Sequence, residues 1–256
     1  MDDATFQGVL ARYSDLLGDN DSRFLRRIYA GGLDRYRERI AAVGFTGHSA
    51  VLDAGCGFGQ WALALAACNA SVVGVDVGAI RLRFLSDLSA AAGVDNLQVR
   101  HASLDRLPFD EARFDAVFCY GVVFCTDWKR SLAEMLRVVR RGGRVYVNVN
   151  DIGWTLHLFR NEPNRADDYD PRAVAVANFQ NTLAYERDGR APERGQIIIS
   201  CEQLCSEAAR LGAAVVACGA EGTLRLDARA PQPRPFFQAA YDGLPGCFEV
   251  VLEKPV

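Results

Sequence analysis

The sequence lacks several features that would assign it to a class at once. Its eight cysteines form no CxxC pair, it has no block of basic residues, and no apolar run approaches the roughly 18 residues that span a bilayer. The first ten residues, MDDATFQGVL, are acidic where a signal peptide is basic. Lys plus Arg number 29 against 32 Asp plus Glu, a balance that does not favour binding to a nucleic-acid backbone. We therefore expect a cytoplasmic protein whose partners include neither nucleic acid nor a membrane.

The spacing of the cysteines gives only weak support to a metal site. Cys201 and Cys205 have the i,i+4 spacing of one helix face, but no histidine stands near them in the sequence. The simplest interpretation of the set is reduced, buried thiols that act as small hydrophobic residues, with disulfides or a zinc site as the alternatives. The eight are Cys56, Cys68, Cys119, Cys125, Cys201, Cys205, Cys218 and Cys247.

The order of apolar segments predicts the fold. From residue 48 to 150, short apolar runs alternate with helical stretches, the pattern of a parallel sheet covered by helices on both faces. Residues 1–47 have helical periodicity, 151–196 form a polar insertion after the fifth strand, and 197–256 supply a helix and two more strands. We predict one α/β doubly wound, Rossmann-like domain with a seven-stranded, mostly parallel sheet that an antiparallel strand completes.

A glycine-rich turn, VLDAGCGFGQW, follows the first predicted strand. Gly55, Gly57 and Gly59 remove side chains where a ligand can approach the backbone and the amides of a helix N-terminus. Asp53 ends the strand before the turn, and Asp76 ends the next strand, where a carboxylate can accept both hydroxyls of a ribose. A turn required only for packing the strand against its helix is the alternative.

The spacing of these glycines argues against one ligand class. A dinucleotide fingerprint requires glycine at the first, third and sixth positions, and Gln60 stands at the sixth position here. A Rossmann-type oxidoreductase that uses a nicotinamide cofactor is therefore disfavoured, although it stays open as an alternative function.

From residue 49 to 150 the sequence closely resembles the class I S-adenosylmethionine-dependent methyltransferases, and it does so more loosely to residue 256. In that family VLDAGCGFG holds the methionine half of the cofactor, VVGVDV ends at the ribose ligand, and the segment HASLDRLPF contacts adenine. A serine stands where the family commonly has an acidic residue for the adenine amino group, and FCYGVVF differs from the NPPY tetrapeptide of nucleobase and glutamine methyltransferases. The resemblance implies S-adenosyl-L-methionine as cofactor, S-adenosyl-L-homocysteine as product, and these cofactor-binding residues: Asp53, Gly55, Cys56, Gly57, Gly59, Asp76, Val77, Ser103, Leu104 and Cys119.

Methyl transfer requires in-line positioning of a nucleophile, exclusion of water and, for a hydroxyl acceptor, a general base. Three residues that follow the carboxyl ends of predicted strands are candidates for the base: Tyr120, Asp151 and His157. Strand-end capping is the alternative for Asp151, and packing on an amphipathic helix is the alternative for His157. Trp61, Tyr120, Phe124 and Trp154 are candidates for the wall of a pocket or for core packing.

The acceptor is expected to be a small molecule that is methylated on oxygen or nitrogen. We expect residues 1–47 and the insertion 151–196 to close over the site as a lid, since their polar composition gives them little core. The arginines of the insertion form a solvated surface or grip an anionic group of the substrate; they are Arg160, Arg165, Arg172, Arg187 and Arg190. A non-catalytic relative with a regulatory or structural role is the remaining alternative, and a homodimer is a further expectation.

Overall fold

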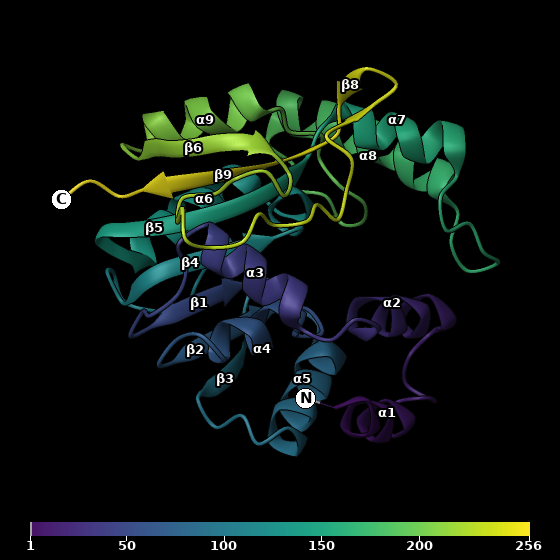
Figure 1. The fold of residues 1–256 in the computed structure, drawn as a ribbon. Helices are drawn as coiled ribbons and strands as arrows, with labels where there is room; N and C mark the ends of the chain where they lie inside the picture. The colour runs from purple at the N-terminus through teal and green to yellow at the C-terminus, as the bar shows by residue number, and fades with distance from the viewer. Residues whose placement is uncertain (1) are drawn as a thin grey trace.

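A computed structural model describes residues 2–256 of the chain, and its centre is one seven-stranded sheet (Figure 1). The strand order is β3-β2-β1-β4-β5-β9-β6. Strands β1 to β5 pair in parallel, and β9 lies antiparallel between β5 and β6. The predicted doubly wound sheet with an antiparallel closing strand is therefore confirmed. The strands are β1 (Val51–Ala54), β2 (Val72–Asp76), β3 (Leu97–His101), β4 (Phe114–Tyr120), β5 (Val139–Asn150), β6 (Ala214–Ala220) and β9 (Cys247–Glu253), and β7 (Ala240–Tyr241) pairs with β8 (Leu244–Pro245) in a separate hairpin.

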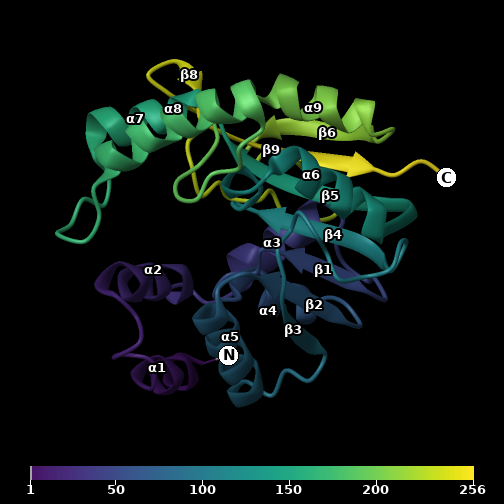
Figure 2. The same ribbon diagram turned by 180° about the vertical axis from the view of Figure 1, so that it is seen from behind.

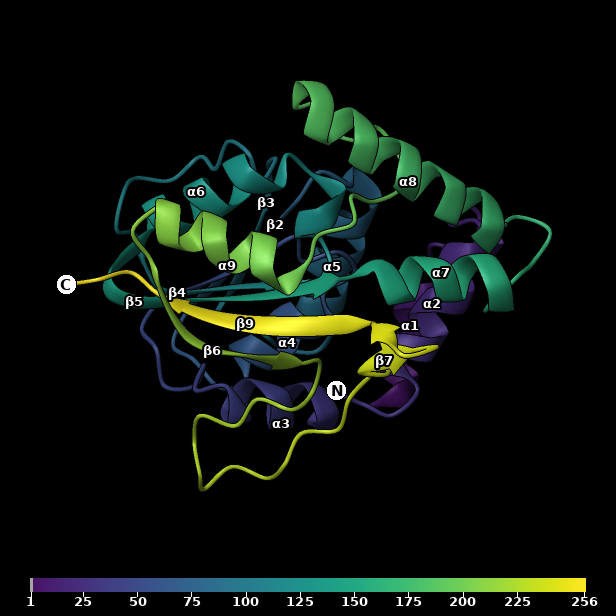
Figure 3. The ribbon, with the colours of Figure 1, turned by 90° about the horizontal axis from the view of Figure 1, so that it is seen from above.

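Helices cover both faces of this sheet, as the view from above shows (Figure 3). Alternate residues of β1 point to opposite faces, so Val51 joins one buried cluster with α1 to α5 and Leu52 joins another with α6 and α9. The helices are α1 (Asp3–Ala11), α2 (Asp19–Tyr29), α3 (Asp34–Ala42), α4 (Gln60–Ala66), α5 (Ala79–Ala91), α6 (Trp128–Val138), α7 (Ile152–Asn161), α8 (Pro171–Asp188) and α9 (Cys201–Arg210), with one 3-10 turn, η1 (Val123–Cys125).

Local sequence signals explain most helix ends. Ser200 caps α9 through a capping box with Gln203, and Gly212, one residue beyond the C-cap Leu211, has φ +80°. Helix α6 ends at Val138 because Val139 is already extended and pairs with Phe114. Strand β5 therefore begins directly after this helix.

The parallel strands place their carboxyl ends at one edge of the sheet. Ala54, Asp76, Tyr120 and Asn150 end β1, β2, β4 and β5, and α1, α2, α7 and α8 lie beyond this edge (Figures 1 and 2). Ligands of open α/β sheets bind in the crevice outside the carboxyl ends of the strands, so the candidate site is there. Within residues 2–256, no helix is both long and apolar enough to cross a membrane.

The N-terminal helices differ from the expectation in one respect. They are not short of core: Phe6, Leu10 and Leu25 are at most 4% exposed and belong to the same buried cluster as α4 and α5. The helical periodicity of residues 1–47 indicated an apolar stripe, and the structure shows that this stripe packs on the core. Closure of this segment as a lid stays a prediction.

Candidate active site

The three glycines of the turn have different roles in the structure. All have positive φ, +84° at Gly55, +52° at Gly57 and +95° at Gly59, so each favours glycine. A Cβ at Gly55 would lie 2.6 Å from Val122, and one at Gly59 would overlap the side chain of Leu85. A Cβ at Gly57 would meet nothing within 4 Å. Gly55 and Gly59 therefore permit packing, and Gly57 leaves the backbone open to a ligand.

Asp53 has a buried carboxyl group, one oxygen of which has no hydrogen-bond partner. Its side chain is 1% exposed and its Oδ2 has no hydrogen-bond partner within residues 2–256. Burial, with a smaller contribution from the nearby charge of Asp76, raises the pKa of Asp53 to about 8. Two further polar atoms, Gln60 Oε1 and Trp61 Nε1 at the start of α4, are also buried and unpaired. Such atoms are costly unless a ligand completes their hydrogen bonds.

Asp76 faces the same turn from the end of β2. Its Oδ2 accepts a hydrogen bond from Gly57 N at 3.0 Å, and its Oδ1 accepts one from Gly78 N at 2.7 Å. A carboxylate has about four acceptor positions, so capacity remains for hydroxyl groups of a ligand. The structure thus brings Asp53, Gly57 and Asp76 together, as the sequence predicts.

The remaining residues predicted to bind the cofactor fall into two groups, with exposed and with buried side chains. Val77 is 61% exposed and Ser103 is exposed. Both side chains are therefore accessible to a flat ring such as adenine. Leu104, Cys56 and Cys119 are at most 3% exposed and pack within the buried clusters. Their side chains support the walls of the site, and contact with a ligand would have to come from their backbone.

Tyr120 ends β4 inside a buried polar network. Its hydroxyl donates to Glu221 Oε1 at 2.9 Å, and its ring lies against Trp61 with centroids 4.5 Å apart. Burial and the neighbouring Glu221 raise the pKa of Tyr120 well above its ordinary value. The hydroxyl therefore stays protonated at neutral pH and donates to a carboxylate.

The rest of this network could not be read from the sequence. Arg39 of α3 is fully buried and donates to Glu221 at 2.6 Å and to Glu249 at 3.0 Å. Tyr146 donates to the same Glu249 at 2.6 Å. These residues lie up to 210 positions apart in the chain, so no local pattern signals them. The network joins α3 to β9 and to the segment after β6.

Asp151 and His157 have structural contacts that match the alternatives weighed for them. Asp151 is the N-cap of α7, accepts a hydrogen bond from Ile152 N at 2.6 Å and lies near the backbone N–H of Cys201. Burial raises the pKa of Asp151 although both N–H groups oppose the shift. His157 stacks on Tyr241 with centroids 4.3 Å apart. A catalytic role for either stays a prediction.

Aromatic side chains form two neighbouring groups beside the turn. Phe236 packs against Trp61 and Tyr120, with ring centroids 5.9 and 6.1 Å away. The next residue, Phe237, packs on Trp154 at 5.2 Å, next to His157. The backbone amides of both phenylalanines donate to Glu221 Oε2. Phe124, in contrast, is 3% exposed and belongs to the core.

The N-terminal helices and the insertion meet on the surface. Asn20 N donates to Asp168 Oδ2 at 2.6 Å, Arg23 forms an ion pair with Asp168, and Arg27 donates to Asn164 at 3.1 Å. Each arginine of the insertion that could bind a substrate anion forms an ion pair with a carboxylate, which agrees with a solvated surface. These arginines are Arg160, Arg165, Arg172, Arg187 and Arg190.

Two surface hollows lie away from the turn. One, of 280 Å³, is lined by residues of α3, α4 and the segment from Ala92 to Asn96. The other, of 420 Å³, lies between α1 and α2. Neither includes Asp53, Gly57 or Asp76 among its lining residues, so the unpaired polar atoms, rather than a hollow, locate the candidate site.

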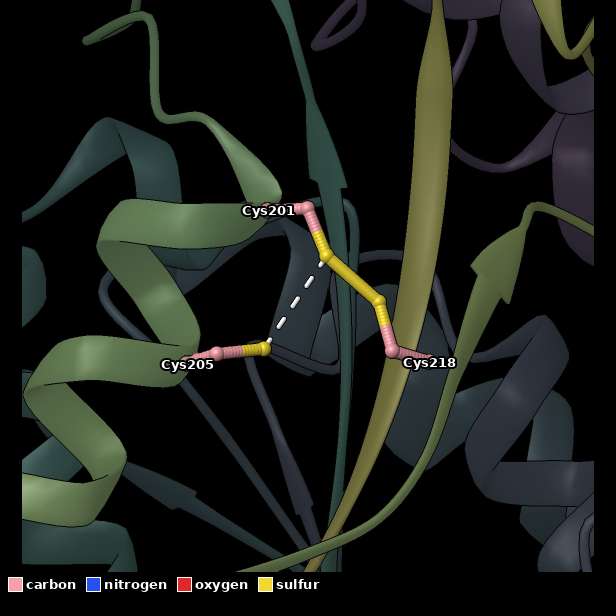
Figure 4. A group of neighbouring side chains, drawn as sticks. All are labelled: Cys201, Cys205 and Cys218. Carbon is pink, nitrogen blue, oxygen red and sulfur yellow. Dashed lines mark hydrogen bonds between the residues drawn. A yellow bond between two sulfur atoms is a disulfide. The ribbon is translucent and has the colours of Figure 1, made fainter.

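The cysteine interpretation needs a correction. Cys201 and Cys218 are joined by a disulfide, and Cys205 lies beside them (Figure 4). The expectation that all eight cysteines are reduced is therefore wrong for this pair. The sequence concealed the pair because Cys218 comes from β6, 17 residues after Cys201.

Comparisons with known proteins agree with this geometry. The profile of a family described as "Methyltransferase domain" matches residues 51–143. A demethylmenaquinone methyltransferase of Deinococcus radiodurans is 37% identical over 129 residues, 47% of this chain and 52% of that protein. The ubiquinone/menaquinone biosynthesis C-methyltransferase UbiE of Geotalea daltonii is 32% identical over 133 residues, 48% of this chain and 56% of that protein. The chain thus spans about half the length of the curated relatives it matches.

Solved structures extend the likeness to most of the fold. Geranyl diphosphate C-methyltransferase from Streptomyces coelicolor, in complex with Mg²⁺, geranyl diphosphate and S-adenosyl-L-homocysteine, has a TM-score of 0.60 at 15% identity and covers 86% of this chain and 78% of its own. The [4+2]-cyclase SpnF has a TM-score of 0.60 at 19% identity and covers 87% and 81%. At these identities the likeness shows the fold alone.

The fold is an α/β domain of the Rossmann-like type. Residues 51–143 are similar to the methyltransferase domain that the family model describes.

Proposed function

We propose that this protein transfers a methyl group from S-adenosylmethionine to a small-molecule acceptor. The observation that carries the proposal is the set of unpaired, buried polar atoms on either side of the turn between β1 and α4, together with the open space at Gly57. A sulfonium cofactor supplies an activated methyl group, so the protein has only to bind, orient and exclude water.

The residues of the site fit this cofactor. The unpaired Oδ2 of Asp53 would accept from the cationic amino group, and ion pairing there would offset the burial that now keeps this carboxyl protonated. Asp76 would accept from the ribose hydroxyls, and the exposed Val77 and Ser103 would contact adenine. These roles extend the family pattern to this chain residue by residue.

The range of acceptor atoms is broader here than the oxygen and nitrogen expected from the sequence. Oxygen and nitrogen are the acceptor atoms expected there, but the relatives include a named C-methyltransferase and a demethylmenaquinone methyltransferase. The aromatic residues Trp61, Tyr120 and Phe236 beside the turn suit a flat, apolar acceptor. We therefore propose an aromatic or similarly apolar small molecule, with carbon added to the possible acceptor atoms.

The test is methyl transfer, since the fold is also that of a named [4+2]-cyclase. The protein would be incubated with methyl-labelled S-adenosylmethionine and either a reduced demethylated naphthoquinone or a small-metabolite extract. We expect labelled product and one S-adenosyl-L-homocysteine per methyl transferred. If the protein binds the cofactor tightly but gives no labelled product from either source, the proposed activity is refuted and the protein is a non-catalytic cofactor-binding module.

A further inference from the structure

Three thiols from two elements meet outside the candidate active site. Cys201 and Cys205 lie on successive turns of α9, and Cys218 comes from the edge strand β6 (Figure 4). Their sulfur atoms all lie within 4.8 Å of one another. Among the potential metal ligands of residues 2–256, which are Cys, His, Asp and Glu side chains, these three cysteines form the group that is close enough to share one metal ion.

The spacing of the Cys201 and Cys205 sulfurs matches that of two thiolates around one metal ion. Cys201 Sγ and Cys205 Sγ are 3.9 Å apart. Two thiolates bound to one tetrahedral zinc ion at about 2.3 Å lie about 3.8 Å from each other. The Cα atoms of Cys201 and Cys218 are 7.7 Å apart, a wide spacing compared with the roughly 5.5–6 Å common in disulfides and well suited to sulfurs that share an ion.

The position of Cys201 favours thiolate charge, and the group is accessible to solvent. Cys201 is the first residue of α9, where the helix dipole and the free backbone amides stabilise negative charge. Cys218 is exposed, and the other two cysteines are half-buried, so an ion can enter from solvent. A fourth coordination position would be left to water or a small anion, as in zinc sites with three protein ligands.

We propose that Cys201, Cys205 and Cys218, when reduced, form a three-thiolate site for one soft metal ion such as Zn²⁺. The disulfide and the metal site exclude each other because both use the sulfurs of Cys201 and Cys218. Reduction of the disulfide by a phosphine consumes two electrons and two protons and gives two thiols. Binding of the ion then releases the thiol protons to solvent. The bound ion joins α9 to β6, independently of the cofactor turn.

The test uses the full chain, reduced with a phosphine under anaerobic conditions and titrated with Co²⁺ and then Zn²⁺. Cobalt reports thiolate ligation by its charge-transfer and ligand-field absorption, and metal analysis after gel filtration gives the stoichiometry. We expect one ion per chain and proton release on binding. The oxidised protein is expected to bind at least tenfold more weakly.

Single substitutions distinguish this site from adventitious binding. Cys201→Ser, Cys205→Ser and Cys218→Ser should each weaken binding at least tenfold, while Cys68→Ser, at a half-buried thiol after α4, should bind like the unmodified chain. Equal binding by Cys205→Ser and the unmodified chain would overturn the three-thiolate site. Reduced protein that takes up no ion, with the Cys201–Cys218 disulfide found by mass spectrometry before reduction, would also overturn it. Circular dichroism of each variant checks that it folds.

Discussion

At the scale of single residues, the candidate site depends on groups whose environment is incomplete without a ligand. The raised pKa of Asp53 is the clearest case, because desolvation dominates and no cation lies against its Oδ2 in residues 2–256. The buried carboxyl therefore favours its neutral form in the cofactor-free protein and its ionised form once a cationic group is bound beside it.

This predicts a pH dependence of stability for Asp53→Asn. The folded-state pKa, about 8, is raised above the ordinary 3.8, so the stability that the native carboxyl contributes is full below about pH 4 and is lost as the pH rises through 8. Asparagine does not ionise. The stability of the variant relative to the unmodified protein should therefore increase by more than about 1 kcal/mol between pH 5 and 8. Urea unfolding of the cofactor-free proteins measures it, and a difference that is constant across this range would contradict the assignment.

A second prediction separates the roles of the glycines. Asparagine tolerates positive φ, so Gly57→Asn should fold with a loss of less than about 1 kcal/mol, yet bind S-adenosyl-L-homocysteine at least tenfold more weakly because its side chain occupies the open space. Gly93→Asn is the matched control, with φ +68° and equally open surroundings in a distant turn. Calorimetric titration that finds equal affinity for the two variants would remove Gly57 from the site.

At the scale of elements, the buried network holds α3 to the sheet. Arg39→Met leaves Glu221 and Glu249 buried without their cation, and breaking one partner of a buried pair typically costs about 3–5 kcal/mol. Thermal and urea unfolding should show a loss of this size. Arg144→Met is the control, since its pair with Glu253 is about one-third exposed and should cost less than about 1 kcal/mol. Similar small losses in both variants would show that the network adds little stability.

The contacts of Asp168 with α2 predict a coupled response to the cofactor. If α2 and the insertion close over the site together, S-adenosyl-L-homocysteine should slow hydrogen exchange in α2, in α7 and in the glycine turn, with little change in the strand centres. Asp168→Ala removes the contacts with Asn20 and Arg23 and should reduce the protection of α2 alone. Protection confined to the glycine turn in the unmodified protein would refute closure.

The elements that the sequence predicts are those with local signals. Strands β1 and β2 are short apolar runs, α9 has its capping box, and the glycine turn stands between a strand and a helix. The burial of α1 and α2 against α4 and α5 was missed because periodicity indicates an apolar stripe but not the surface on which it packs. The Arg39 network and the Cys201–Cys218 pair were missed because their partners come from distant strands, and only the assembled sheet brings such residues together.

At the scale of the whole molecule, the sheet places Asp53, Gly57 and Asp76 at one edge, and helices from the N-terminal segment and from the insertion after β5 lie beyond it. This arrangement follows from parallel pairing, which collects the carboxyl ends of β1, β2, β4 and β5 on the same side. The proposed function depends on binding of S-adenosylmethionine at this edge.

Calorimetric titration with S-adenosyl-L-homocysteine tests this binding most directly. We predict one site per chain in the unmodified protein and in Asp95→Ala, which removes an exposed carboxylate far from the turn. Asp76→Ala should bind more weakly by more than about 1 kcal/mol, roughly fivefold, because two ribose hydroxyls lose a charged acceptor. Circular dichroism should show that both variants fold. Undiminished affinity in Asp76→Ala, or binding of NAD in place of S-adenosyl-L-homocysteine, would contradict the account.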